Sequence, residues 1–181
     1  MNKIKINFNE EENEILTKRT DNLSQATKLV EQKSNDKITY LTFNVNNIRY
    51  AVEQSYIQEL HSEISPKKIP CVPKFIKGIV NIRGDILSIT DLSLFFGNKA
   101  IAERDNYQMF RLKNKNIEFG VIVDNIEDTL LLSKADIYAF SNSENPKMDQ
   151  YIKGVDKDMV NILNIDSIMN DDLMIINNNN S

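Results

Sequence analysis

Arg83 is the residue of this chain that is best placed to act by direct contact. It stands in the tripeptide Arg83-Gly84-Asp85, between the apolar runs at 79–82 and 86–89. Glycine adopts a positive φ readily, so the tripeptide predicts a tight hairpin turn with Gly84 in that conformation. A charge held at the tip of a rigid turn indicates a contact point. The alternative is that the guanidinium only ties the turn to neighbouring carbonyl groups.

The other reactive side chains predict no catalytic or metal site. His61 is the one histidine, and we expect it at an exposed or edge position. Cys71 is the one cysteine; its apolar setting predicts a buried, inert thiol, and a single cysteine forbids a disulfide within the chain. Asp156, Asp158 and Asp166 lack the spacing of a calcium-binding loop and are interpreted as solvated carboxylates. The sequence therefore predicts a protein that is no enzyme and holds neither cofactor nor metal.

Length and charge narrow the class of protein further. The 181 residues fit one domain, or two very small ones that share a core. A net charge of −4 and a pI near 5.1 argue against a general binder of nucleic acid or of anionic membranes. A local basic segment at 67–77, with Phe75 among its lysines, leaves a single-stranded nucleic-acid-binding barrel as the alternative function. No apolar run is long enough to span a bilayer, so a cytoplasmic protein is expected.

Three regions follow one another along the chain. Residues 1–36 are polar and contain one amphipathic helical pattern, from about residue 10 to residue 30. That helix either packs on its own domain or binds a partner. Residues 37–170 form the β-rich body, with a polar internal boundary near 98–106, and residues 171–181 are expected to be a disordered tail.

The β-rich body contains an internal repeat. Apolar and polar residues alternate on both sides of Asn46-Asn47, which predicts a hairpin with one buried face. The order strand, turn, strand, aspartate and short helix then occurs twice, from Gly78 to Asp91 and from Gly154 to Asp166. Asp91 is expected to be the N-cap of its helix. Strands this short and closely spaced favour two small barrels over a sandwich.

These segments resemble those of the CheW-like chemotaxis coupling proteins. The resemblance spans roughly residues 38–170, and its individual motifs become specific through their combination and order. The matching motifs are Tyr40-Leu41-Thr42-Phe43, Ile48-Arg49-Tyr50-Ala51-Val52, Ile57-Gln58-Glu59-Leu60, the run 69–78, Asn81-Ile82-Arg83-Gly84, Asp91-Leu92, the run 119–124 and Tyr151-Ile152-Lys153-Gly154.

The resemblance implies an all-β fold of two five-stranded SH3-like barrels that share a hydrophobic core, with short helices. It also implies a stand-alone, cytoplasmic adaptor, recruited to membrane receptor arrays without inserting into the membrane. Its partners would be the regulatory domain of the histidine kinase CheA and the cytoplasmic tips of methyl-accepting chemotaxis receptors, and it would bind no nucleic acid.

The matched motifs divide into contact residues and architecture. By resemblance, Arg83, Glu59, Leu60 and Ile57 are expected to contact receptor or kinase. The structural turn and cap positions are Gly78, Gly84, Asp91 and Gly154.

Two positions depart from the family pattern. Ser88 stands where proline is usual, and Thr90 where an apolar residue is usual. Both are expected to make the outer face of their hairpin more polar.

Overall fold

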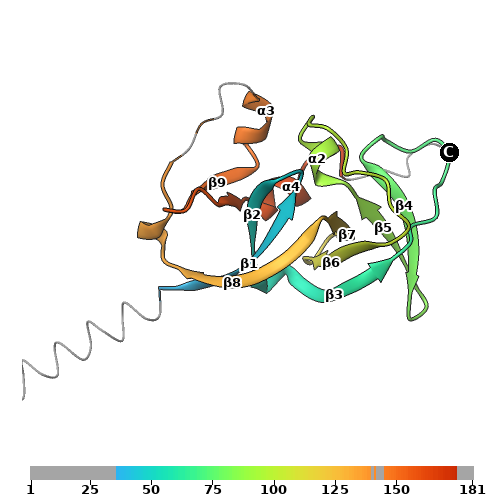
Figure 1. Cartoon of the computed structure of the whole chain (residues 1–181), viewed down its shortest axis with the longest axis horizontal. Coiled ribbons are helices and arrows are strands. Elements are labelled where there is room, and N and C mark those ends of the chain that lie inside the picture. The colour runs from blue at the N-terminus through green and yellow to red at the C-terminus, as the bar shows by residue number, and fades with distance from the viewer. Residues whose placement is uncertain (1–35, 140, 142–144, 175–181) are drawn as a thin grey trace, which may run out of the picture. The chain divides into compact units, whose positions relative to one another are not determined.

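The computed structural model describes residues 36–139, 141 and 145–174, and its helices and strands lie in one compact unit, 38–181 (Figure 1). The helix predicted for residues 10–30 lies outside the described residues. Within the described part, ten strands form two sheets. Sheet A has the order β8-β1-β2-β10-β9, with β8 at Asn125–Leu132, β1 at Ile38–Val45, β2 at Ile48–Glu53, β10 at Asn161–Leu163 and β9 at Ile152–Val155. Sheet B has the order β3-β6-β7-β5-β4, with β3 at Ile57–Ile64, β6 at Tyr107–Lys113, β7 at Glu118–Val123, β5 at Asp85–Thr90 and β4 at Ile76–Ile82.

Short helices connect the strands. Each sheet forms an SH3-like barrel, called barrel A and barrel B below, so the expected fold class is confirmed. The helical elements are η1 at Gln54–Tyr56, α2 at Leu92–Phe95, η2 at Lys134–Asp136, α3 at Pro146–Asp149 and α4 at Ile165–Met169.

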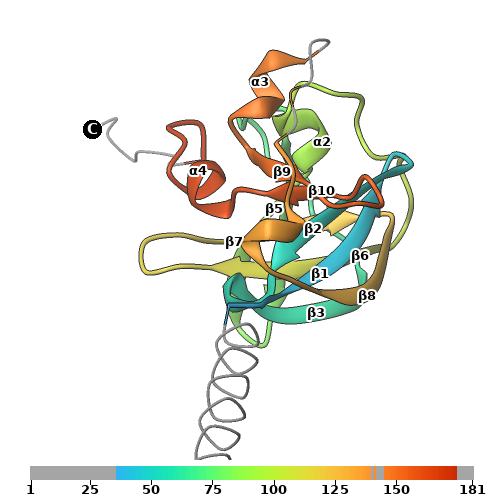
Figure 2. The ribbon, with the colours of Figure 1, turned by 90° about the vertical axis from the view of Figure 1, so that its left-hand side faces the viewer.

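The two barrels exchange hairpins between the halves of the chain. Barrel A combines β1 and β2 from the first half with β8, β9 and β10 from the second (Figure 2). Barrel B does the reverse, because it combines β6 and β7 with β3, β4 and β5. In both barrels, the hairpin from the other half pairs with one parallel strand: β2 of the β1–β2 hairpin pairs with β10, and β7 of the β6–β7 hairpin pairs with β5. The internal repeat therefore exists, but the polar stretch at 98–106 does not separate the two barrels.

The first hairpin, β1–β2, is buried on both of its faces. Asn46 and Asn47 form the predicted turn, with φ of 51° and 65°, which asparagine tolerates better than most residues. Phe43 faces a core shared with barrel B, where its ring centroid lies 4.9 Å from that of Phe110. Tyr40 and Ala51 belong to a second apolar cluster of barrel A. The expectation of one buried face was therefore wrong, because this hairpin lies between the apolar cluster of barrel A and the core shared with barrel B.

Each barrel closes at a glycine. A single β-bridge joins Lys67 to Ile79 in barrel B, and another joins Tyr138 to Val155 in barrel A. Gly78 precedes the bridged Ile79 and has a φ of 150°, and Gly154 precedes the bridged Val155 and has a φ of 155°. A Cβ at either glycine would lie 2.3 Å from the carbonyl oxygen of the crossing residue. Both positions are therefore structural.

Several local expectations were wrong. Cys71 is exposed, because its segment crosses the surface between β3 and β4 and Cys71 itself has a φ of 60°. Asp156 is buried, because its Oδ1 accepts hydrogen bonds from the backbone N–H groups of Asp158 and Val160 within the β9–β10 turn. The cap of α4 is Asn164, which accepts from the N–H of Ser167; Asp166 lies inside the first turn of that helix.

The chain also stays folded beyond residue 170. Asp171 accepts a hydrogen bond from the Tyr151 hydroxyl at 2.5 Å, and Met174 is buried. Residues 171–174 thus belong to the folded body and not to a disordered tail. Residues 175–181 lie outside the described part.

Candidate interaction site

Arg83 occupies the tip of the β4–β5 hairpin, as predicted. Ile82 pairs with Asp85, so Arg83 and Gly84 form the two-residue turn, with φ of 52° and 99°. The Asn81 side-chain oxygen accepts a hydrogen bond of 2.8 Å from the Gly84 N–H and holds the turn. Arg83 is exposed, and its guanidinium makes no hydrogen bond or ion pair with any described residue. The turn is therefore tied by Asn81, and the Arg83 side chain is available to a partner.

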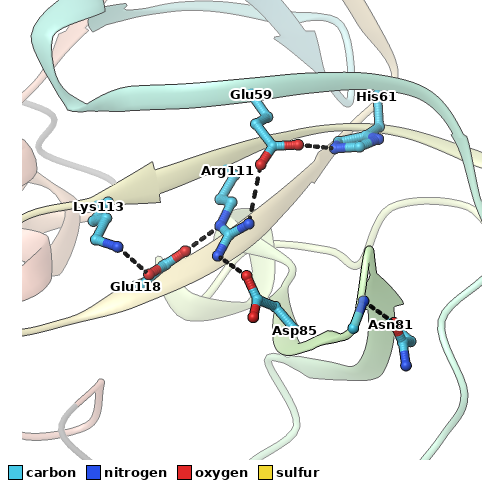
Figure 3. Close-up of polar contacts among 8 residues, drawn as sticks. Glu59, His61, Asn81, Asp85, Arg111, Lys113 and Glu118 are labelled. Atoms are coloured by element: carbon cyan, nitrogen blue, oxygen red, sulfur yellow. Dashed lines mark hydrogen bonds and ion pairs between the residues drawn. The ribbon is translucent and has the colours of Figure 1, made fainter.

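A cluster of charged side chains gathers on sheet B around Arg111 of β6 (Figure 3). Its guanidinium donates to Glu59 Oε1 on β3 at 3.0 Å. It also donates to Asp85 Oδ2 at the start of β5, at 3.1 Å, and to Glu118 on β7. Lys113 adds a second cation, with its Nζ 2.9 Å from Glu118 Oε2. One mostly buried arginine on β6 thus links its own strand to β3, β5 and β7 of the same sheet.

The strand register explains how Arg111 reaches three carboxylates. On β6, Met109 and Arg111 alternate with Phe110, so they face away from the core that Phe110 shares with barrel A. Arg111 lies opposite Glu59 on one side and Gly120 on the other. From β6 the guanidinium extends across β7 to Glu118 and on to Asp85 of β5. The missing side chain of Gly120 leaves room for Ile89, Met109 and Leu87 inside the barrel.

The charges of this cluster stabilise one another. The hydrogen bond to Asp85, followed by the one to Glu118, raises the pKa of Arg111. The hydrogen bond from Lys113, with a smaller contribution from Arg111, holds the pKa of Glu118 below its ordinary value. Arg111 and Glu118 are therefore both ionised at neutral pH, and the hydrogen bonds of Arg111 hold the three carboxylates in place.

β3 is the edge strand of sheet B, and it carries the remaining predicted contact residues. Glu59 and His61 alternate with Leu60, so Leu60 projects from the opposite face. The register of β3 shifts between Ile57 and Glu59, and Ile57 pairs with Leu112, on the core-facing side of β6. Leu60 is 50% exposed, whereas Ile57 is half-buried against the core. Glu59 is engaged on both oxygens, by Arg111 and by His61 Nε2 at 3.1 Å. His61 thus has its expected edge position, and Leu60 is the most accessible residue of this motif.

An open groove of about 590 Å³ separates the end of β3 from the Arg83 hairpin. The groove adjoins the Lys67–Ile79 bridge, beyond which the edges of β3 and β4 separate. Ile86 on the hairpin side is 65% exposed. The groove thus places apolar surface beside the Arg83 tip. Its lining includes Glu63, Ile64, Ser65, Asn81, Ile82 and Ile86.

Asp91 is architectural, as expected. One of its oxygens accepts from the N–H groups of Ser93 and Leu94, at 2.9 and 3.2 Å, and caps α2. The other accepts from the Ile101 N–H at 2.9 Å, which ties down the polar connection after α2. Burial outweighs these hydrogen bonds and raises the pKa of Asp91.

The basic segment at 67–77 does not form a nucleic-acid platform. Phe75 is buried, with its ring edge-on to Phe95, so it cannot stack on a base. Lys77 is mostly buried and pairs with Glu103 at 3.0 Å, and Lys68 lies 3.6 Å from the same carboxylate. The alternative function is therefore not favoured.

Sequence reasoning missed Arg111. Its only signal was a charged residue among the apolar side chains of Met109, Phe110 and Leu112, and its partners Glu59 and Asp85 lie 52 and 26 positions away. Thr90 was also misjudged. It is fully buried, and its hydroxyl has no hydrogen-bond partner among the residues that the structure describes, so it does not make an outer face more polar. Ser88 is only partly buried.

Within the described residues, no group of histidine, cysteine, aspartate and glutamate side chains could hold a metal ion. The same part of the chain contains no helix with the length and apolar character needed to cross a membrane.

Comparisons with known proteins agree with this architecture. Chemotaxis protein CheW of Bacillus subtilis is 24% identical over 135 residues, which cover 75% of this chain and 85% of that protein. Chemotaxis protein CheW of Klebsiella aerogenes is 30% identical over 98 residues, but the match spans only 54% of this chain and 59% of that protein. The crystal structure of the scaffolding protein TtCheW from Thermoanaerobacter tengcongensis superposes with a TM-score of 0.59 at 23% identity, covering 70% of this chain and 86% of that chain.

The two SH3-like barrels place the chain in the fold class of the scaffolding protein TtCheW. The family model described as CheW-like domain matches residues 39–173. The chain therefore belongs to the CheW-like family of chemotaxis adaptors.

Proposed function

We propose that this protein is a non-enzymatic adaptor that couples methyl-accepting chemotaxis receptors to the histidine kinase CheA. The observation that carries the proposal is the exposed Arg83, which pairs with no residue in the described part of the chain, on a short turn beside an apolar groove. Membership of the CheW-like family supports it. The partners are the regulatory domain of the kinase and the cytoplasmic tip of the receptors, so the protein acts in the cytoplasm at receptor arrays and inserts into no membrane.

The contact surface combines apolar and charged parts. Ile86 and Leu60 are 65% and 50% exposed, and burying them against a partner supplies affinity. Arg83 supplies orientation, because a guanidinium forms directional hydrogen bonds to carboxylates. Glu59 contributes through its fixed negative charge, since both of its oxygens are already engaged. Ile57 supports the edge strand β3 by packing against the core.

The mechanism is transmission through a stiff body. The barrels share one apolar core and exchange hairpins, so they move as a unit. Such a body holds receptor and kinase in a fixed register. A small displacement of the receptor can then bias the kinase between two states without any chemistry in the adaptor.

The test is binding of the full-length chain to the isolated regulatory domain of the cognate kinase, measured by calorimetry. We expect a dissociation constant of roughly micromolar or tighter. Arg83→Ala should weaken it about tenfold, because a central arginine at an interface often contributes this much. No binding by a folded protein would refute the proposal. Salt-sensitive binding to a single-stranded oligonucleotide would instead support the alternative function.

A further inference from the structure

Beyond Ile82, which packs against the main core, the tip of the β4–β5 hairpin is exposed. On its β3 side lies the groove of about 590 Å³, and Ile86 is 65% exposed. The Asn81–Gly84 hydrogen bond is internal to the tip. Among the hydrogen bonds and ion pairs of the described residues, only the Asp85–Arg111 pair joins a side chain of residues 81–86 to another element.

The second repeat offers an internal comparison. In barrel A, Val155 is both the bridged residue and the last residue of β9, so its hairpin turns at once. In barrel B, Ile79 is the bridged residue, but β4 continues to Ile82 before the turn. The tip that carries Arg83 is thus an extension beyond the closed part of barrel B. An extension of this kind needs an anchor if its charge is to be held in one direction.

Arg111 is a suitable anchor. Its side chain is 11% exposed, and it is fixed on two further sides by Glu59 and Glu118. Asp85, by contrast, is 69% exposed. An ion pair with one exposed partner contributes little to folding stability, so its main effect is on orientation.

We propose that Arg111 is a positioning residue: through Asp85 it fixes the direction of the hairpin tip and so of Arg83. This inference rests on the proposed function, because it assigns Arg83 to a partner contact. It adds a residue that makes no partner contact itself and acts from β6, two strands away from β5 in sheet B. Specificity at the tip then depends on a pair, Arg111 and Asp85, as well as on Arg83.

A double-mutant cycle tests this proposal. Binding to the kinase regulatory domain is measured for the wild type, Asp85→Asn, Arg83→Ala and the double variant. Asp85→Asn should weaken binding about two- to fivefold, in line with a partly exposed ion pair. In the Arg83→Ala background the same change should have no further effect, because the direction of an absent side chain is irrelevant.

The outcomes separate the inference from the proposed function. If Arg83→Ala leaves binding unchanged, the proposed contact site fails and the inference falls with it. If Arg83→Ala weakens binding but the two effects multiply, or Asp85→Asn has no effect, the inference alone is overturned. Lys113→Met is the matched control, because Lys113 contacts Glu118 but no residue of the hairpin. It should leave both the affinity and the coupling unchanged, and Asp85→Asn should unfold at the wild-type temperature.

Discussion

Gly78 on β4 and Gly154 on β9 occupy equivalent positions in the two internal repeats. Each lies under the carbonyl oxygen of the residue that closes its barrel, Lys67 or Tyr138. Each has a positive φ near 150°. The two barrels are therefore closed by the same device, a glycine that lets a crossing backbone approach within hydrogen-bonding distance of the next strand residue.

Replacing either glycine should destabilise the protein. Gly78→Ala places a Cβ 2.3 Å from a carbonyl oxygen, so the bridge must shift. We expect a loss of about 3 kcal/mol in the free energy of unfolding, measured by urea denaturation. Gly97→Ala is the control, because Gly97 has a φ of 83° but no atom within 4 Å of an added Cβ. It should cost only about 1 kcal/mol; equal losses would show that the close approach is unimportant.

Thr90 leads to the opposite expectation. Its buried hydroxyl has no partner, so Thr90→Val removes an unsatisfied polar group without changing the shape. The free energy of unfolding should rise by roughly 1 kcal/mol. Thr42→Val is the matched control, since the buried Thr42 hydroxyl donates to the Asp128 carbonyl at 2.7 Å. That variant should lose about 1 kcal/mol. A destabilised Thr90→Val would mean that a partner for this hydroxyl exists in solution.

The sequence predicted what local patterns determine. Asn46-Asn47 formed the expected turn, Asp91 the expected cap, and Arg83 the expected tip. Turn and cap residues act through their own backbone or through neighbours a few positions away, so their type and spacing are sufficient.

Long-range pairing could not be predicted in the same way. The exchange of hairpins depends on which strand of one half lies beside which strand of the other, and alternation alone carries no such information. Arg111 went unnoticed for this reason, because its role appears only when β3, β6 and β5 are brought together. Cys71 shows a different error: an apolar neighbourhood in sequence became a surface crossing in space.

Acid should weaken the Arg111 cluster. Lys113, and to a lesser extent Arg111, hold the pKa of Glu118 below its ordinary value. A lowered pKa in the folded state stabilises the fold above the ordinary pKa, and this contribution is lost as the pH falls through the lowered value. The free energy of unfolding should therefore decline between about pH 5 and pH 3. Glu118→Gln should flatten that decline, and Glu63→Gln, at an exposed position, should not; identical profiles for both would contradict the assignment.

Ile86 separates binding from folding. Because its side chain is 65% exposed, Ile86→Ser should change the free energy of unfolding by less than about 0.5 kcal/mol. Its place beside the groove and the Arg83 tip should make the same change weaken binding to the kinase regulatory domain by roughly tenfold, because an apolar anchor is then lost from the contact surface. Leu131→Ser is the control: Leu131 is 57% exposed on β8 of barrel A, away from that hairpin, and its loss should leave this affinity within twofold of wild type, about 0.4 kcal/mol. If both variants lost affinity alike, general surface hydrophobicity, and not the Arg83 hairpin, would account for the contact.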